Sequence, residues 1–293
     1  APISFSKEKL DIQVLNYFKL KSKKPVNLNP WKKITKIILQ KKKQVNIAII
    51  GKYVELKDAY KSLDEALTHG GIKNNVKVNL IRIDSEKLKV SEIKFKLKNI
   101  SGILIPGGFG KRGTDGKIEA IKFARNNKIP FLGICYGMQM AIIEFARNQL
   151  NLKKATSSEF DKKGIPIIGL INEWKKDGKI IKGTDKDLGG TMRLGSYDAK
   201  LKDNSKIKKI YGKNVIKERH RHRYEVNVAY KEKFEKKGMF FSGLSPDGTL
   251  PEIIELENHP WFIGVQFHPE FKSRPLAPHP LFSSFIKASK NHK

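Results

Sequence analysis

One short stretch, residues 129–148, constrains the fold more than any other part of the chain. An apolar run at 129–132 enters the sequence Gly-Ile-Cys-Tyr-Gly at 133–137, and residues with helical spacing follow. A strand that turns this sharply into a helix predicts a nucleophile elbow, whose central residue is strained and exposed at the edge of a sheet. Both glycines suit such a turn because a Cβ atom would collide with the closely packed chain. We therefore expect Cys135 to be an exposed nucleophile rather than a buried structural cysteine, with the helix N-terminus favouring its thiolate.

Strand and helix patterns alternate on either side of this turn. Apolar strands are predicted at 45–51, 76–83, 100–106 and 131–135, and helices at 60–69 (ended by Gly70-Gly71), 93–97, 118–126 and 137–148. Such alternation predicts an α/β fold with a mostly parallel sheet and helices on both faces. Ligands bind at the carboxyl ends of the strands in these sheets, and both Cys135 and the Gly107-Gly108 loop lie at such ends.

The remaining segments extend this core. Short strands are predicted at 165–171, 191–201, 219–228 and 239–243, followed by a buried strand at 263–268 and a helix at 280–289. We interpret the short strands as an antiparallel extension on the same domain, which would span 45–293. Residues 1–44 lack the regular strand and helix pattern of the rest of the chain. We predict that they are an interdomain linker with one or two short helices, which would connect this domain to an earlier part of the protein.

Composition narrows the function classes. A single cysteine among 293 residues excludes an internal disulfide and fits a reducing compartment. The sequence shows neither a signal peptide nor an apolar run long enough to span a bilayer, so we expect a soluble cytoplasmic protein. The net charge of +30 suggests a polyanion partner, but only 9 of the 59 basic residues are arginine and the lysines are scattered. We interpret the charge mainly as solvated surface and expect no nucleic-acid partner; attraction to polyanions or to an acidic domain is the alternative.

Two further segments supply partners for a nucleophilic cysteine. The loop Pro106-Gly107-Gly108-Phe109-Gly110 follows a predicted strand; it lacks the Gly-Lys-Ser/Thr ending of a phosphate-binding loop, and we expect an oxyanion hole rather than a plain turn. His268 and Glu270 lie two residues apart at the end of the strand at 263–268, which places both on one face. The histidine can move a proton and the carboxylate can fix its tautomer, so Cys135, His268 and Glu270 form a candidate triad.

A charged stretch at 218–225 is the third segment that could contribute to a functional site. On a strand, Arg219, Arg221 and Arg223 would share one face and the two intervening histidines the other. A histidine pair without cysteine or nearby carboxylate support is weak evidence for a metal, and we predict no metal site. An edge that binds carboxylates or packs against another domain fits better.

Several of these motifs together resemble one family. The Gly-Ile-Cys-x-Gly-Met-Gln and Phe-His-Pro-Glu strings are similar to those of triad-type, class I glutamine amidotransferases. The resemblance is closer still to the C-terminal glutaminase domains of the CTP synthase family, from residue 45 to about 287. It is carried by strings at 51–53, 58–62 (Asp-Ala-Tyr-Lys-Ser), 106–110, 189–195 (Gly-Gly-Thr-Met-Arg-Leu-Gly), 218–227, 259–261 and 266–271.

The resemblance implies hydrolysis of L-glutamine to glutamate and ammonia through a cysteine thioester. Cys135 would attack the substrate amide, His268 would shuttle the proton and Glu270 would orient the histidine. Backbone N–H groups of Gly108 and Tyr136 would form the oxyanion hole. The implied glutamine-binding residues are Gly108, Phe109, Tyr136, Gly137, Met138, Gln139, Glu159 and Arg223, with Glu159 suited to the substrate's ammonium.

The resemblance also implies a partner outside this chain. In the whole enzyme an N-terminal synthetase domain would use the ammonia to aminate UTP to CTP, with ATP, Mg²⁺ and GTP as activator, in a homo-tetramer; this domain itself would need no cofactor. Tyr136 departs from the leucine usual in this family, and Asp115 stands where glutamate is common in the loop thought to respond to GTP. The alternatives are a glutaminase domain of another amidotransferase, such as GMP synthetase, or a catalytically silent assembly or polyanion-binding domain.

Overall fold

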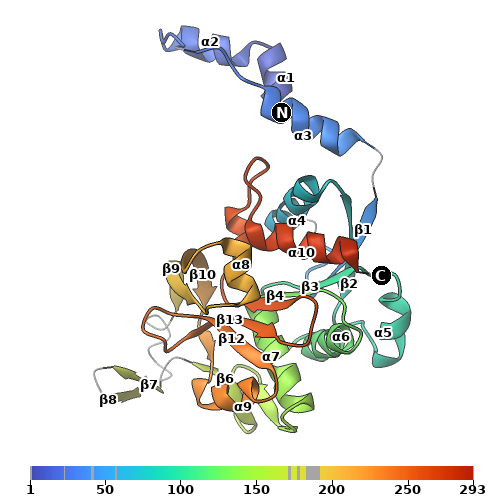
Figure 1. The fold of residues 1–293 in the computed structure, drawn as a ribbon, viewed down its shortest axis with the longest axis vertical. Helices are drawn as coiled ribbons and strands as arrows, with labels where there is room; N and C mark the ends of the chain where they lie inside the picture. Colours follow the sequence, from blue (N-terminus) through green and yellow to red (C-terminus); the bar gives the residue numbers. More distant parts are fainter. Residues whose placement is uncertain are drawn as a thin grey trace.

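A nine-stranded sheet forms the frame of the protein in the computed structural model, which describes residues 2–22, 24–40, 43–56, 58–170, 173–176, 179–182 and 192–292 (Figure 1). The strand order is β10-β9-β12-β13-β14-β4-β3-β1-β2. In chain order the strands are β1 (Gln44–Gly51), β2 (Lys77–Asp84), β3 (Gly102–Ile105), β4 (Phe131–Ile134), β9 (Arg193–Leu201), β10 (Val215–His222), β12 (Met239–Leu244), β13 (Pro251–Leu256) and β14 (Phe262–Val265). Strands β14, β4, β3, β1 and β2 run parallel, and the other neighbours are antiparallel. This arrangement confirms the predicted mostly parallel sheet with an antiparallel extension.

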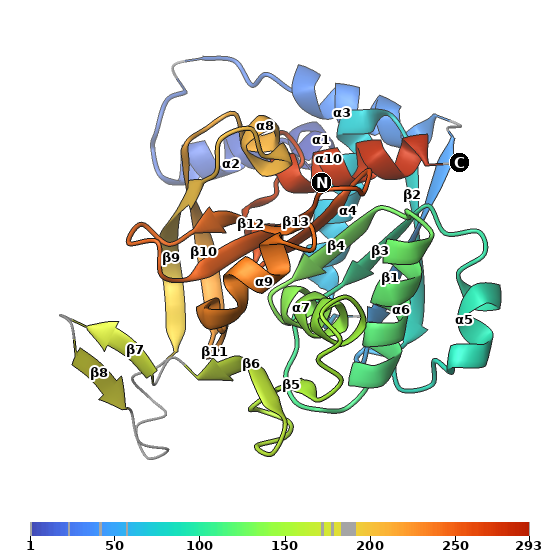
Figure 2. The same cartoon turned by 60° about the horizontal axis from the view of Figure 1, so that its bottom comes forward.

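Helices cover both faces of the sheet, as predicted. The helices after residue 44 are α4 (Lys61–Asn74), α5 (Val90–Lys96), α6 (Thr114–Asn126), α7 (Tyr136–Asn148), α8 (Lys206–Tyr211), α9 (Lys231–Glu235) and α10 (Pro280–Asn291), with short 3₁₀ turns at Val228–Tyr230 and Pro269–Lys272. One buried core lies between the sheet and α5, α6, α7 and α9, and a second lies under α4, α8 and α10. Figure 2 shows α6 and α7 in front of the central strands.

Smaller strands complete this part of the chain. Strands β5 (Ala155–Ser157), β6 (Ile165–Leu170) and β11 (Tyr224–Val226) form a three-stranded sheet, and β7 (Glu173–Lys176) pairs with β8 (Lys179–Lys182). Ile171, Gly189, Gly190 and Thr191, which belong to a predicted strand or to the 189–195 motif, lie outside the described residues.

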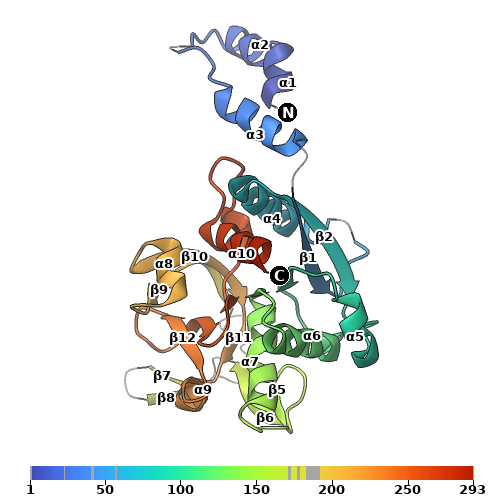
Figure 3. The same cartoon turned by 45° about the vertical axis from the view of Figure 1, so that its right-hand side comes forward.

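The first helices form an arm apart from the sheet (Figures 1 and 3). The arm contains α1 (Pro2–Lys7), α2 (Leu10–Tyr17) and α3 (Asn29–Leu39), none of which has a buried residue. The predicted number of one or two helices was therefore wrong, while the boundary at residue 45 and the linker role stay predictions. No helix in the described part of the chain combines the length and apolarity needed to cross a membrane.

The predicted end of α4 at Gly70-Gly71 was also wrong. The helix continues to Asn74 and ends at Asn75, which adopts the left-handed conformation (φ 56°). A Cβ atom on Gly70 would lie 2.8 Å from the carbonyl oxygen of Phe282 in α10, and one on Gly71 would lie 2.7 Å from Val78 in β2. These glycines therefore allow close helix packing rather than stopping the helix.

Candidate active site

Three neighbouring strands bring the predicted catalytic segments together. Cys135 directly follows β4, His268 lies just beyond β14 and Gly107 follows β3. These strands are adjacent and parallel, with Val265 opposite Ile134. Their carboxyl ends therefore meet at one edge of the sheet, although the segments are far apart in sequence.

The turn at Cys135 has the strained geometry expected of an elbow. Cys135 has φ 50° and ψ −102° and is the N-cap residue of α7. A Cβ atom on Gly133 would lie 2.7 Å from the carbonyl carbon of Gly137, and one on Gly137 would lie 2.1 Å from the carbonyl oxygen of Ile105. Both glycines are therefore required because strand, helix and β3 pass so close to each other. A non-glycine residue in this conformation costs on the order of 1–3 kcal/mol, which the surrounding packing must offset.

The exposure predicted for Cys135 was wrong, because its side chain is only 3% exposed. Its Sγ lies 3.6 Å from Nε2 of Gln266 and 4.0 Å from the carbonyl oxygen of Arg221. Both groups come from segments that the fold lays over the elbow, one beyond β14 and one in β10. The sulfur is therefore enclosed by the protein rather than open at the sheet edge.

His268 is held by Glu270 and interacts with Cys135. Its Nδ1 lies 2.7 Å from Oε1 of Glu270, and its backbone N–H donates to the carbonyl of Arg219 at 2.8 Å. A carboxylate only accepts, so Nδ1 carries a proton and Nε2 is available for proton transfer. Burial lowers the pKa of His268, but hydrogen bonds and charge attraction from Cys135 and Glu270 outweigh it and raise that pKa to about 10. These two partners therefore favour the protonated form of the imidazole.

Gly107 makes room for this imidazole, a role that sequence reasoning missed. A Cβ atom at Gly107 would lie 2.8 Å from Cε1 of His268. The adjacent glycine, Gly108, is less crowded, with no neighbour nearer than 3.9 Å to such an atom. The paired glycines in the motif were a signal, but only the fold shows which one faces the histidine.

Side chains from three segments fix the loop after β3. The Gly110 N–H donates to the Glu159 carboxylate at 2.6 Å, and the Tyr136 hydroxyl donates to the Gly110 carbonyl at 2.5 Å. The Lys52 ammonium donates to the carbonyl of Phe109. Burial raises the pKa values of both Glu159 and Tyr136. Glu159, predicted to hold the substrate's ammonium, is here engaged by the loop.

The other predicted glutamine-binding residues differ in accessibility. Phe109 is 53% exposed, whereas Met138 is fully buried in the core and Gln139 is 3% exposed. Arg223 lies at the bend between β10 and β11. Of these residues, Phe109 is thus the one whose side chain is open to solvent, while Met138 and Gln139 are enclosed.

A buried ionic network lies beside the site. Arg193 Nη2 is 2.8 Å from Glu252 and Nη1 is 3.2 Å from Glu225. His220 and His222 share a 2.9 Å hydrogen bond and are buried on the face of β10 opposite Arg219 and Arg221, which are exposed. This confirms the predicted alternation for these four residues, whereas Arg223 lies beyond the end of the strand. Burial first, and then Arg193, lowers the pKa values of His220 and His222 to about 2 and about 3. Across the described residues, no cluster of three His, Cys, Asp or Glu side chains is placed to hold a metal ion.

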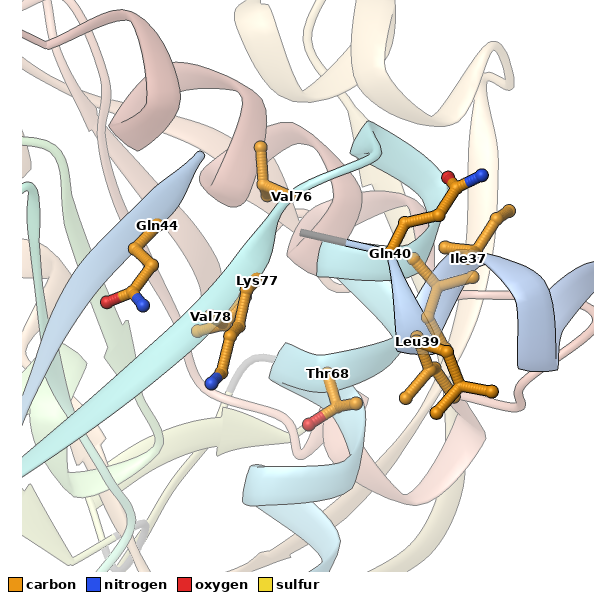
Figure 4. A pocket seen from close by; sticks show the side chains of 10 residues that line it. Ile37, Leu39, Gln40, Gln44, Thr68, Val76, Lys77 and Val78 are labelled. Atoms are coloured by element: carbon orange, nitrogen blue, oxygen red, sulfur yellow. The ribbon is translucent and has the colours of Figure 1, made fainter. Parts of the chain in front are cut away.

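A pocket of about 640 Å³ lies away from these residues, between the end of α3, α4 and β2 (Figure 4). It is lined by Ile37, Ile38, Leu39, Gln40, Gln44, Thr68, Ile72, Val76, Lys77 and Val78. Lys77 is the sole titratable residue among them, so this lining offers no acid–base or nucleophilic pair.

Comparisons with known proteins agree with the fold and identify the family. The family model described as Glutamine amidotransferase class-I matches residues 55–288, and the chain belongs to this family. A solved structure described as the Trypanosoma brucei CTPS glutaminase domain with bound acivicin is 36% identical, with a TM-score of 0.76 over 85% of this chain and 95% of that one. Within the amidotransferases, the chain therefore belongs with the glutaminase domains of CTP synthases.

Two further relatives define how far this likeness extends. The CTP synthase of Pelagibacter ubique (strain HTCC1062) is 90% identical over all 293 residues, which are 54% of that protein, so the chain spans about half the length of the curated relatives it matches. A solved structure from Thermoplasma acidophilum, described as a putative GMP synthase protein, shares the fold at 14% identity and a TM-score of 0.51 over 84% of this chain and 94% of that one. The expected resemblance to CTP synthase is confirmed, and the GMP synthetase alternative has support from the fold alone.

Proposed function

We propose that this chain hydrolyses L-glutamine to glutamate and ammonia, with Cys135, His268 and Glu270 as its triad. The observation that carries the proposal is the 2.7 Å His268–Glu270 pair, whose imidazole interacts with the elbow cysteine. The nucleophile, the proton carrier and the orienting carboxylate are thus linked in the order that nucleophilic catalysis requires.

The reaction follows from these positions. The Cys135 sulfur attacks the carbon of the substrate's side-chain amide, and the thiol proton resides on Nε2 of His268. Backbone N–H groups of Gly108 and Tyr136 stabilise the resulting oxyanion. His268 then donates its proton to the departing nitrogen, which leaves as ammonia, and a thioester remains on Cys135. A water molecule, deprotonated by His268, attacks the thioester and releases glutamate.

Substrate entry requires the loop after β3 to change partners. Glu159 accepts the Gly110 N–H in the structure, so the α-ammonium group of glutamine would take the place of that N–H. The hydrogen bond from Lys52 to Phe109 also constrains the loop. The rest of the substrate would contact Gly108, Phe109, Gly137, Met138, Gln139 and Arg223, through the backbone where the side chain is buried.

The whole protein would use the ammonia elsewhere. By analogy with the CTP synthases that it resembles, an N-terminal synthetase domain outside this chain would aminate UTP with ATP and Mg²⁺, in a cytoplasmic homo-tetramer activated by GTP. The ammonia passes from Cys135 to that domain in this proposal.

Glutamate release by the purified chain tests the glutaminase proposal. We expect turnover in the wild type, more in the presence of the synthetase half, and none above background in Cys135→Ala. An electrophilic glutamine analogue should add once, to Cys135, by mass spectrometry; acivicin, bound in the Trypanosoma brucei structure, is a suitable probe. Turnover that persists in Cys135→Ala would refute the proposal.

A further inference from the structure

Two buried glutamine side chains connect a backbone carbonyl to the catalytic sulfur. Gln139 Nε2, in α7, donates to the Tyr224 carbonyl at 2.9 Å and to Oε1 of Gln266 at 3.2 Å. Gln266 Nε2, just beyond β14, then donates to Cys135 Sγ at 3.6 Å. Gln266 is 0% exposed and Gln139 is 3% exposed, so the connection is shielded from solvent.

The direction of these hydrogen bonds follows from chemistry. The Tyr224 carbonyl can only accept, so the nitrogen of the Gln139 amide must face it. The same nitrogen then presents its second N–H to Gln266, whose oxygen must face it in turn. Gln266 is therefore left with its N–H₂ group toward Cys135, and the orientation of both amides is fixed by one backbone carbonyl.

A donor at this position favours the charged form of the sulfur. A hydrogen bond to an ionised group is about twice as strong as one between neutral groups, and the buried setting strengthens it further. The Arg221 carbonyl, 4.0 Å from Sγ, has the opposite preference, since it can accept a hydrogen bond only from the thiol. Gln266 thus opposes the preference of the Arg221 carbonyl for protonated Cys135.

We propose that Gln266 is a further catalytic residue, whose side-chain N–H stabilises the Cys135 thiolate, and that Gln139 is a positioning residue that acts through Gln266. The proposal rests on the proposed glutaminase function, because it concerns the same nucleophile. In this proposal the Cys135 thiolate has two partners. One is the charged imidazole of His268, and the other is the neutral amide of Gln266, which belongs to a separate chain of hydrogen bonds.

The other titratable groups near the sulfur do not replace this amide. His268 and Glu270 form the triad pair. His220 and His222, inward from β10, have pKa values lowered to about 2 and about 3 by burial and by Arg193, so both are neutral near pH 7. The Gln266 amide is therefore a distinct source of stabilisation that a substitution can isolate.

The pH dependence of Cys135 alkylation tests the proposal without requiring glutamine turnover. Cys135 is the single cysteine of the chain, so iodoacetamide reports on one thiol. Gln266→Met keeps the side-chain length and removes the N–H donor. If Gln266→Met does not fold, Gln266→Leu replaces it in the experiment. Gln149→Met is the matched control, because Gln149 bonds the Asn148 carbonyl away from the site.

We expect Gln266→Met to raise the midpoint of the alkylation profile by about one pH unit, which is about tenfold slower alkylation below the midpoint. The plateau rate at high pH should stay unchanged, since it reports access to a fully ionised thiol. Gln139→Met should shift the midpoint less, and the double variant no further than Gln266→Met alone, because both act on one hydrogen bond.

Two results would overturn the inference. Folded Gln266 variants with the wild-type midpoint, or a shift equally large in Gln149→Met, would show that the amide does not stabilise the thiolate. A wild-type midpoint at the ordinary thiol value of about 8.5 would instead refute the triad proposal, and the inference with it. The two failures are therefore distinguishable.

Discussion

Substituting Gly107 with alanine tests the geometry of the site directly. The added Cβ would lie 2.8 Å from His268 Cε1, closer than the 3.0 Å below which Cβ contacts essentially never occur and well inside ordinary contact at 3.4 Å, so the imidazole or the loop must shift by a few tenths of an ångström. That ring is held by the 2.7 Å bond to Glu270 on one side and by Cys135 on the other. Misplacement of a reacting group by about 1 Å can cost on the order of 10²-fold in rate, so we expect kcat to fall by about 10- to 100-fold, or about 1.4–2.7 kcal/mol.

The same substitution should leave stability nearly unchanged. Gly107 is not among the described glycines with positive φ, so alanine can adopt its backbone conformation. Restricting the unfolded chain stabilises by about 0.4–1 kcal/mol, which opposes the local crowding. Activity should therefore fall without a matching fall in the melting temperature.

Steady-state glutamate release and thermal unfolding, measured on the same preparations, check this prediction. Gly169→Ala is the matched control, because a Cβ there meets only Ser158 Oγ at 3.9 Å. We expect the control to retain wild-type kcat. Full activity in Gly107→Ala, or a loss of activity fully accounted for by unfolding, would refute the reasoning.

Three further predictions follow from strain, charge and burial. Cys135→Gly should be more stable than Cys135→Ala by about 1 kcal/mol in urea unfolding, because glycine relieves the conformation with φ 50° at some cost in chain entropy. Burial lowers the pKa of His268, but Cys135 and Glu270 outweigh burial and raise this pKa to about 10. Protonation of His268 therefore stabilises the folded state fully below about pH 6.5, the pKa of an unfolded histidine, and this stabilisation is lost as the pH rises toward 10. Urea unfolding at pH 6.5 and at pH 10 should therefore show that the free energy of unfolding falls more between these pH values in the wild type than in His268→Gln. Arg193→Met removes the cation that lies between two buried carboxyl groups and should cost about 3–5 kcal/mol at pH 7. Glu225→Gln should cost less in the same assay, because burial raises the pKa of Glu225 to about 8.

The parallel half of the sheet and the elbow could be predicted because their signals are local. Continuous apolar runs indicated strands β1, β3 and β4, and the glycines at 133 and 137 indicated a tight turn before the helix. These features depend on residues that are neighbours in sequence. The same is true of the alternation in β10, where inward and outward side chains follow from the period of a strand.

Features that depend on distant segments could not be predicted in the same way. Gly70 and Gly71 in α4 were interpreted as a helix stop, but they are needed because α10 approaches Gly70 and Val78 of β2 approaches Gly71. Strand β13 was missed because Glu252 and Glu255 interrupt its apolar pattern. Yet both are buried: Glu252 pairs with Arg193, and Glu255 accepts backbone N–H groups at the start of α8.

The burial of Cys135 also depends on segments that are distant in sequence. Gln266 and the Arg221 carbonyl reach the sulfur only after β14 and β10 have joined the sheet. A turn motif specifies the backbone of its own residue but not which side chains will lie above it. Sequence reasoning therefore predicted the turn at Cys135 correctly and misjudged the accessibility of its side chain, while the role of Cys135 as nucleophile stays a prediction.

The pairing of β4 with β14 has a consequence for how this domain can vary. Because Ile134 lies opposite Val265, the spacing between the two strands sets how far Cys135 is from His268, and the chain that connects them does not. Loops and whole strands inserted between these residues would leave that spacing untouched, provided that the two strands still pair. The connecting loops can therefore vary in length, while a register shift of a single residue between these two strands would change the distance between Cys135 and His268.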